Sequence, residues 1–62
     1  MKLIEVIKWE ASHKAIVIVY AESSSDLAGE LKDLTISSGS LAYLANGDVY
    51  VFDGSDWNKI GG

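Results

Sequence analysis

The chain begins with two apolar segments separated by a short polar one. Leu3–Trp9 (LIEVIKW) is rich in β-branched and aromatic residues, and Lys14–Ala21 (KAIVIVYA) is a continuous apolar run too short for a typical helix. The polar residues Glu10–His13 between them are typical of a turn, so the two segments predict a β-hairpin. Because the second segment is apolar at both odd and even positions, we expect its strand to be covered on both sides.

A polar stretch ends this pattern, and a different periodicity follows it. Leu27, Leu31 and Leu34 are spaced i, i+4 and i+7, which places them on one stripe of a helix. Gly29 interrupts the stretch and costs about 1 kcal/mol relative to alanine in a helix. The pattern therefore predicts one short helix or helical turn near residues 25–33, docked on the sheet by its leucines.

The last third of the chain, Gly39–Ile60, predicts a three-stranded antiparallel meander with two tight turns. Asn46-Gly47 is the strongest two-residue hairpin signal, because both central residues of a type I′ turn need positive φ. We place the second two-residue turn at Gly54-Ser55, since this choice keeps one face of the sheet coherent. The predicted pairs are Leu44 with Val49, Tyr43 with Tyr50, Ala42 with Val51, Leu41 with Phe52, Phe52 with Trp57, Tyr50 with Lys59 and Val49 with Ile60.

This register divides the meander into an aliphatic face and an aromatic face. We expect the aliphatic face to pack against the rest of the chain. The aromatic face either closes a small barrel around itself or forms an exposed patch, and such patches on small acidic proteins tend to be interfaces. The aliphatic face consists of Ala42, Leu44, Val49, Val51 and Ile60, and the aromatic face of Leu41, Tyr43, Tyr50, Phe52, Trp57 and the stem of Lys59. Interface energy concentrates on Trp and Tyr, so the candidate interface anchors are Trp57, Phe52, Tyr50, Tyr43 and Trp9.

Together these elements predict a mainly β fold, a small antiparallel sheet or partial barrel made of an N-terminal hairpin and a C-terminal meander. A chain of 62 residues is expected to form a single small β-rich domain, residues 1–62. A domain of this size buries about 60% of its unfolded surface and usually needs disulfides, a metal or a partner. With no cysteine, one histidine and 48% hydrophobic residues, the chain favours association with a partner.

Charge narrows the classes of partner. The net charge of −4 disfavours nucleic acid, which selects basic surfaces, and also anionic membrane surfaces. No apolar run approaches the roughly 18 residues needed to span a bilayer. Charges interrupt the apolar residues at the N-terminus, so they do not form a secretory signal. We therefore expect the protein to be made and kept in a cytoplasm, at least until assembly.

Candidates for catalysis or metal binding are sparse. His13 lies beside Ser12 in a polar turn, whereas a catalytic triad needs a nucleophile, a base and an acid that converge in a pocket. Asp48, Asp53 and Asp56 surround the two turns, where such side chains commonly bond the local backbone, and their spacing lacks the EF-hand series. We expect no catalytic residue, no metal site and no cofactor.

The last third of the chain resembles a pattern common in small structural proteins of tailed bacteriophages. The pattern is carried by Gly39–Tyr43 (GSLAY), Asp48–Ser55 (DVYVFDGS) and Trp57–Ile60 (WNKI), and an Asp-Leu link after an N-terminal hairpin is matched by Asp26-Leu27. The resemblance implies a non-enzymatic virion component, either a capsid decoration or head-fibre subunit or a part of the tail. Such a protein acts by assembling with copies of itself or with a larger virion protein such as the major capsid protein. It implies a location in the virion after assembly in the bacterial host cytoplasm, and the acidic charge argues against a nucleic-acid or membrane partner.

The C-terminal residues carry a second resemblance, to ubiquitin-like sulfur carriers. In that family an activating enzyme adenylates a terminal glycine, and a Gly-Gly pair threads the narrow channel that leads to it. The order of hairpin, helix and strand in these carriers also fits Leu3–Ala21 followed by Ser25–Leu34. Because Ile60 is expected to pack, the terminal pair would have little reach as a tail. The sulfur carrier is therefore the alternative prediction, with Gly61 and Gly62 as its carrier terminus.

Overall fold

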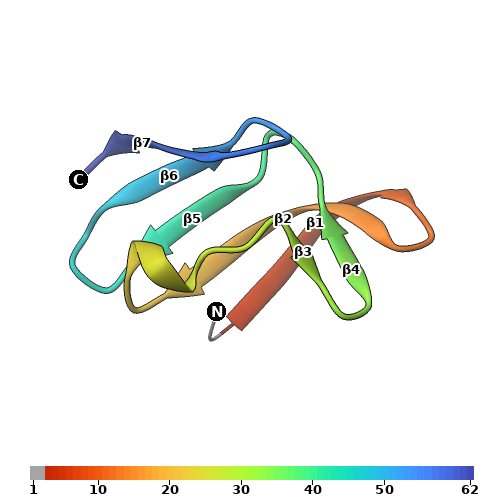
Figure 1. Cartoon of the computed structure of the whole chain (residues 1–62), viewed down its shortest axis with the longest axis horizontal. Helices are drawn as coiled ribbons and strands as arrows, with labels where there is room; N and C mark the ends of the chain where they lie inside the picture. Colours follow the sequence, from red (N-terminus) through yellow and green to blue (C-terminus); the bar gives the residue numbers. More distant parts are fainter. Residues whose placement is uncertain (1–2) are drawn as a thin grey trace.

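One strand, β2 (Lys14–Ala21), has neighbours along both of its edges and forms the centre of the sheet. The structure is a computed structural model that describes residues 3–62. Within this range the strands form a seven-stranded mixed sheet that is not closed, so the predicted mainly β fold is confirmed (Figure 1). The elements are β1 (Leu3–Ala11), β2 (Lys14–Ala21), the 3-10 turn η1 (Ser24–Asp26), β3 (Glu30–Leu31), β4 (Leu34–Ile36), β5 (Leu41–Leu44), β6 (Val49–Phe52) and β7 (Trp57–Gly61).

The N-terminal hairpin is confirmed. β1 and β2 pair antiparallel, from Leu3 opposite Tyr20 to Ala11 opposite Lys14, with the turn at Ser12-His13. Two register shifts in β1 mark bulges, which increase the local twist of a strand.

The other edge of β2 has two successive neighbours. Its first residues pair parallel with β4, and Ile18–Ala21 pair parallel with β5. Following the hydrogen-bonded neighbours gives the order β3-β4-β2-β5-β6-β7. Because β4 and β5 share one edge of β2, β1 pairs with its other edge. The sheet is thus mixed rather than antiparallel throughout. The parallel pairings join segments that are far apart in the sequence, so no local turn pattern predicts them.

Two serines bridge the gap that β4 and β5 leave along β2. The Val17 N–H donates to Ser40 Oγ at 3.0 Å, and Ser40 Oγ donates to Ser37 O at 2.7 Å. The Ser37 N–H in turn donates to Ala15 O at 2.8 Å. Ser37 and Ser40 are both fully buried. A serine hydroxyl therefore replaces the backbone carbonyl that a continuous partner strand would supply.

The segment near residues 25–33 contains a helical turn and then a small hairpin. The predicted helical turn is confirmed as η1, but the leucines do not form a helical stripe. Leu31 lies opposite Leu34 in the β3–β4 pair, because pairing of β4 with β2 holds this part of the chain extended. Leu27 and Leu34 nevertheless pack against the core, although not from a helix.

The turn at Asn46-Gly47 differs from its prediction. Gly47 has a φ of 95°, but no residue other than glycine has positive φ in residues 3–62, so a type I′ turn is not formed. The Leu44 N–H donates to Asp48 O at 2.9 Å, and the Gly47 N–H donates to Leu44 O at 3.0 Å. The loop that these bonds close is Ala45–Gly47, one residue longer than predicted.

The longer loop changes which residues pair across β5 and β6, so the predicted register of this hairpin is wrong. A shift of one residue moves a side chain to the opposite face of a sheet. The second turn is confirmed at Gly54-Ser55, although a further shift in β7 leaves Ile60 unpaired with Val49. The observed pairs are Tyr43 with Val49, Ala42 with Tyr50, Leu41 with Val51, Phe52 with Trp57, Tyr50 with Lys59 and Val49 with Gly61.

As a result, the predicted aromatic face does not form. Tyr50 and Phe52 share a face with Ala42, which is fully buried, and Tyr43 lies on the opposite face. We call the face that holds the core the inner face. Its buried apolar residues are Ala15, Val17, Val19, Ala21, Ile36, Ala42, Leu44 and Phe52.

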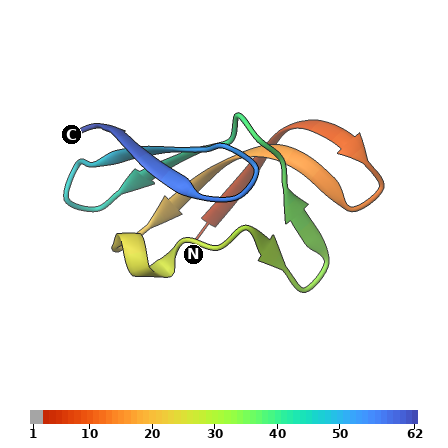
Figure 2. The ribbon, with the colours of Figure 1, turned by 45° about the horizontal axis from the view of Figure 1, so that its top comes forward.

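The chain covers the inner face with the segment that joins β2 to β4 (Figure 2). The Trp57 Nε1–H donates to Ala28 O at 3.1 Å, and a Cβ placed on Gly29 would lie 2.9 Å from Phe52 Cζ. Glycine therefore permits the close approach of this segment to the Phe52 ring. On the opposite side of β2, Ile18 is half-buried and Tyr20 is exposed, so residues 3–62 do not supply the second cover expected for this strand.

Candidate interface

The face of the sheet opposite the core carries two rows of apolar side chains. We define the outer face as Leu3, Ile16, Ile18, Tyr20, Leu41, Tyr43, Val49 and Val51, which the strand registers place on the same side.

The first row crosses four strands from β1 to β6. Leu3 lies opposite Tyr20, Tyr20 is aligned with Tyr43, and Tyr43 lies opposite Val49. Leu3 is 60% exposed, Tyr20 37% and Tyr43 39%. The two tyrosine rings stack with centroids 5.9 Å apart and planes inclined by 25°. The row therefore presents a pre-formed aromatic pair with apolar residues on either side.

The second row runs parallel to the first. Ile18 is aligned with Leu41, and Leu41 lies opposite Val51, all three of them half-buried. Glu5 on β1 and Asn58 on β7 lie at its two ends. Polar residues thus border an apolar centre, which is the usual anatomy of a protein–protein interface.

The five aromatic residues proposed from the sequence do not lie on one surface. Phe52 is 4% exposed and contacts the Trp57 ring with centroids 5.0 Å apart, so both belong to the inner face. Tyr50 also packs against the core. Trp9 is 56% exposed and lies opposite Ala15, whose side chain is buried on the inner face. Of the five, Tyr43 is the one that the registers place on the outer face.

The sequence reasoning missed Tyr20, Ile18 and Val51 as interface candidates. A signal for the first two was present, because alternation along β2 places Ala and Val on one face and the larger Ile and Tyr on the other. The role of Val51 depended on the register of β5 with β6, which the turn prediction misplaced by one residue.

Asp53 organises the second turn. Its Oδ1 accepts the Asp56 N–H at 2.7 Å and the Ser55 N–H at 2.8 Å, and its Oδ2 accepts Asn58 Nδ2 at 3.1 Å. These hydrogen bonds, the one from the Asp56 backbone foremost, hold the pKa of Asp53 below its ordinary value of 3.8. Within residues 3–62, no group of three or more His, Asp or Glu side chains is arranged to hold a metal ion.

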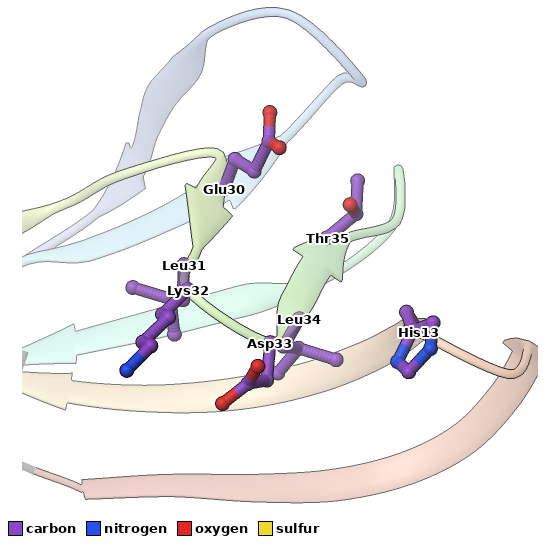
Figure 3. Close-up of a pocket in the computed structure, with 7 residues that line it drawn as sticks. All are labelled: His13, Glu30, Leu31, Lys32, Asp33, Leu34 and Thr35. Atoms are coloured by element: carbon purple, nitrogen blue, oxygen red, sulfur yellow. The ribbon is translucent and has the colours of Figure 1, made fainter.

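A hollow of about 260 Å³ lies between the β3–β4 hairpin and the turn that contains His13. The Thr35 N–H donates to His13 O at 2.6 Å and holds the two segments together. Figure 3 shows the Glu30 carboxylate and the Lys32 amine pointing away from the His13 ring. The polar groups therefore do not converge on one point where a ligand or a reacting atom would be held.

The terminal glycines lie beside β6. Gly61 is part of β7 and pairs with Val49. Gly62 has a φ of 130°, and a Cβ there would lie 2.7 Å from Asp48 Cα. Both glycines are thus in contact with the sheet in this conformation.

Comparison of the chain with protein families, curated proteins and solved structures gives no match. In the described range, residues 3–62, no helix is long and apolar enough to span a membrane.

Proposed function

We propose that this chain is a non-enzymatic structural subunit of a tailed-bacteriophage virion, either a capsid decoration or accessory protein or a part of the tail. Its activity is assembly, in which the outer face is buried against another subunit of the particle, either a copy of this chain or a larger virion protein.

The observation that carries the proposal is the outer face. Eight apolar side chains from four strands form one surface, and in the part of the chain that the structure describes three of them are exposed and five are half-buried. Monomeric proteins rarely expose contiguous apolar patches of more than a few hundred Å², and larger ones mark interaction sites. Tyrosine is a frequent interface anchor, and Tyr20 and Tyr43 stack at the centre of the first row.

The virion setting rests on the resemblance of Gly39–Ile60 to phage structural proteins. The residues of that pattern have identifiable structural roles here. Gly54 supplies positive φ in the second turn, and Trp57 contacts Phe52 and bonds Ala28 O. These roles stabilise the meander and leave the outer face available for assembly.

The test is the protein composition of purified particles from the phage that encodes the chain. We expect the protein to sediment with the particles in a fixed ratio to the major capsid or tail protein. A particle that lacks the protein would refute the virion proposal. Formation of a thiocarboxylate at Gly62 with ATP and an activating enzyme would instead support the sulfur-carrier alternative.

A further inference from the structure

We propose that the partner that covers the outer face is a second copy of this chain, packed face to face to form a two-layered β-sandwich. This inference rests on the proposed function, because it names the occupant of the surface through which the protein assembles.

The composition of the core is the first argument. Five of its eight buried apolar residues are alanine or valine, namely Ala15, Ala21, Ala42, Val17 and Val19. Small side chains bury little apolar surface, and a chain of this length already has little to bury. A second layer would bury the larger Ile18, Leu41 and Tyr43 and so add to a core that is small for one sheet. Each molecule of the chain has other copies of the same chain available as partners. A second copy can therefore cover the outer face of every subunit.

The area of the sheet that carries the outer face is the second argument. Each residue of a sheet covers about 16 Å² of flat area, because strands rise about 3.3 Å per residue and lie about 4.8 Å apart. The strands β1, β2, β5, β6 and β7 have 9, 8, 4, 4 and 5 residues. Two facing copies would therefore cover about 960 Å² of flat sheet, and more accessible surface because side chains stand out from it. A specific interface needs about 1,000 Å² in total.

Charge is the third argument. The chain has a net charge of −4, and two copies repel each other wherever their acidic surfaces meet. Outside the bulges, the charged residues that the registers place on the outer side are Glu5, Lys8, Lys14 and Glu30, which is two of each sign. They surround the apolar rows and do not interrupt them. The outer side is therefore neutral although the chain is acidic, and a neutral apolar surface matches its own copy without repulsion.

The first experiment measures mass and thermal stability across protein concentrations. Sedimentation equilibrium should give a particle of twice 6.7 kDa, and the Tm should rise with concentration because dissociation is coupled to unfolding. Tyr43→Lys should weaken dimerisation at least about 100-fold, since it places a charge at the centre of the buried face. Trp9→Lys is the matched control, because Trp9 is exposed on the other side of the sheet, and it should leave the dimer intact.

The second experiment uses the unmodified chain, so it does not depend on whether a variant folds. In a mixture of isotope-labelled and unlabelled protein, intermolecular NOEs should join the rings of Tyr20 and Tyr43 to methyl groups of Leu41, Val49 or Val51 in the other copy. Intermolecular NOEs that involve Trp9 or Trp57 instead would overturn the assignment of the face.

The outcomes separate this inference from the proposed function. A protein that stays monomeric at millimolar concentration but is found in purified particles would overturn the second-copy inference and leave the virion proposal standing. A dimer through the outer face of a protein absent from particles would support the inference and refute the virion proposal. A dimer that Trp9→Lys disrupts and Tyr43→Lys does not would overturn the inference.

Discussion

Replacing Ser40 by alanine should destabilise the protein more than any other serine substitution in the connector between β4 and β5. The Ser40 hydroxyl accepts the Val17 N–H at 3.0 Å and donates to Ser37 O at 2.7 Å, and the residue is fully buried. Alanine can neither accept nor donate a hydrogen bond, and the space left by one oxygen atom is smaller than a buried water molecule needs. The Val17 N–H would therefore be left unpaired in the interior, at the point where β2 changes its partner strand.

The magnitude follows from these two bonds. A buried donor left without a partner costs about 1–3 kcal/mol. The Ser37 carbonyl still accepts a weaker hydrogen bond from the Ser40 N–H at 3.3 Å, so it is not left without a partner. We expect a decrease of about 2 kcal/mol in the free energy of unfolding. For a domain of this length that corresponds to a fall in Tm of about 8–16 °C.

The measurement is chemical and thermal unfolding at one fixed protein concentration, combined with amide hydrogen exchange. The Val17 amide should exchange faster in Ser40→Ala than in the original protein. Ser37→Ala is the matched control, since Ser37 is equally buried but its Oγ has no hydrogen-bond partner within residues 3–62. Removing that hydroxyl should leave stability unchanged or raise it. If Ser40→Ala costs no more than Ser37→Ala, the reasoning about the bridging hydroxyl is refuted.

Substitutions at three further positions test other parts of the structure. Gly29→Ala should cost about 1–3 kcal/mol by overpacking, because its Cβ would lie 2.9 Å from the buried Phe52 ring, and unchanged stability in urea unfolding would contradict that contact. Gly47→Ala should cost about 1–2 kcal/mol through backbone strain alone, since φ is 95° and an added Cβ would meet no atom within 4 Å beyond its chain neighbours, while Gly47→Asn should cost less. Asp53 has a folded pKa below 3.8, so its contribution to stability is present above that pH and is lost as pH falls through the folded value. Asp53→Asn keeps the turn acceptor but cannot titrate, so the stability difference from the original protein should shrink with acidification, and a constant difference would count against this role.

The stability predictions and the second-copy inference share one physical basis. A single sheet with a core of small side chains is marginally stable, so the loss of one buried hydrogen bond is a large fraction of the total. If folding and dimerisation are coupled, Ser40→Ala should also raise the concentration at which the dimer dissociates.

The sequence alone determined those features that depend on neighbouring residues. The N-terminal hairpin follows from two apolar segments around a polar turn, and the second turn from Gly54 in a position that needs positive φ. The pairing of Phe52 with Trp57 then follows by counting outward from that turn. In each case the hydrogen bonds join residues close in the chain, so local residue preferences specify the geometry.

Only the tertiary structure decided the parallel pairing of β2 with β4 and β5, the register of β5 with β6, and hence the two faces of the sheet. Parallel pairs join distant segments, and their hydrogen bonds leave no local pattern. The loop of the first hairpin in the meander can be two or three residues long, and Asn46-Gly47 is compatible with both lengths. That one residue places Tyr50 and Phe52 on the inner face and Tyr43 on the outer face, because side chains alternate along a strand.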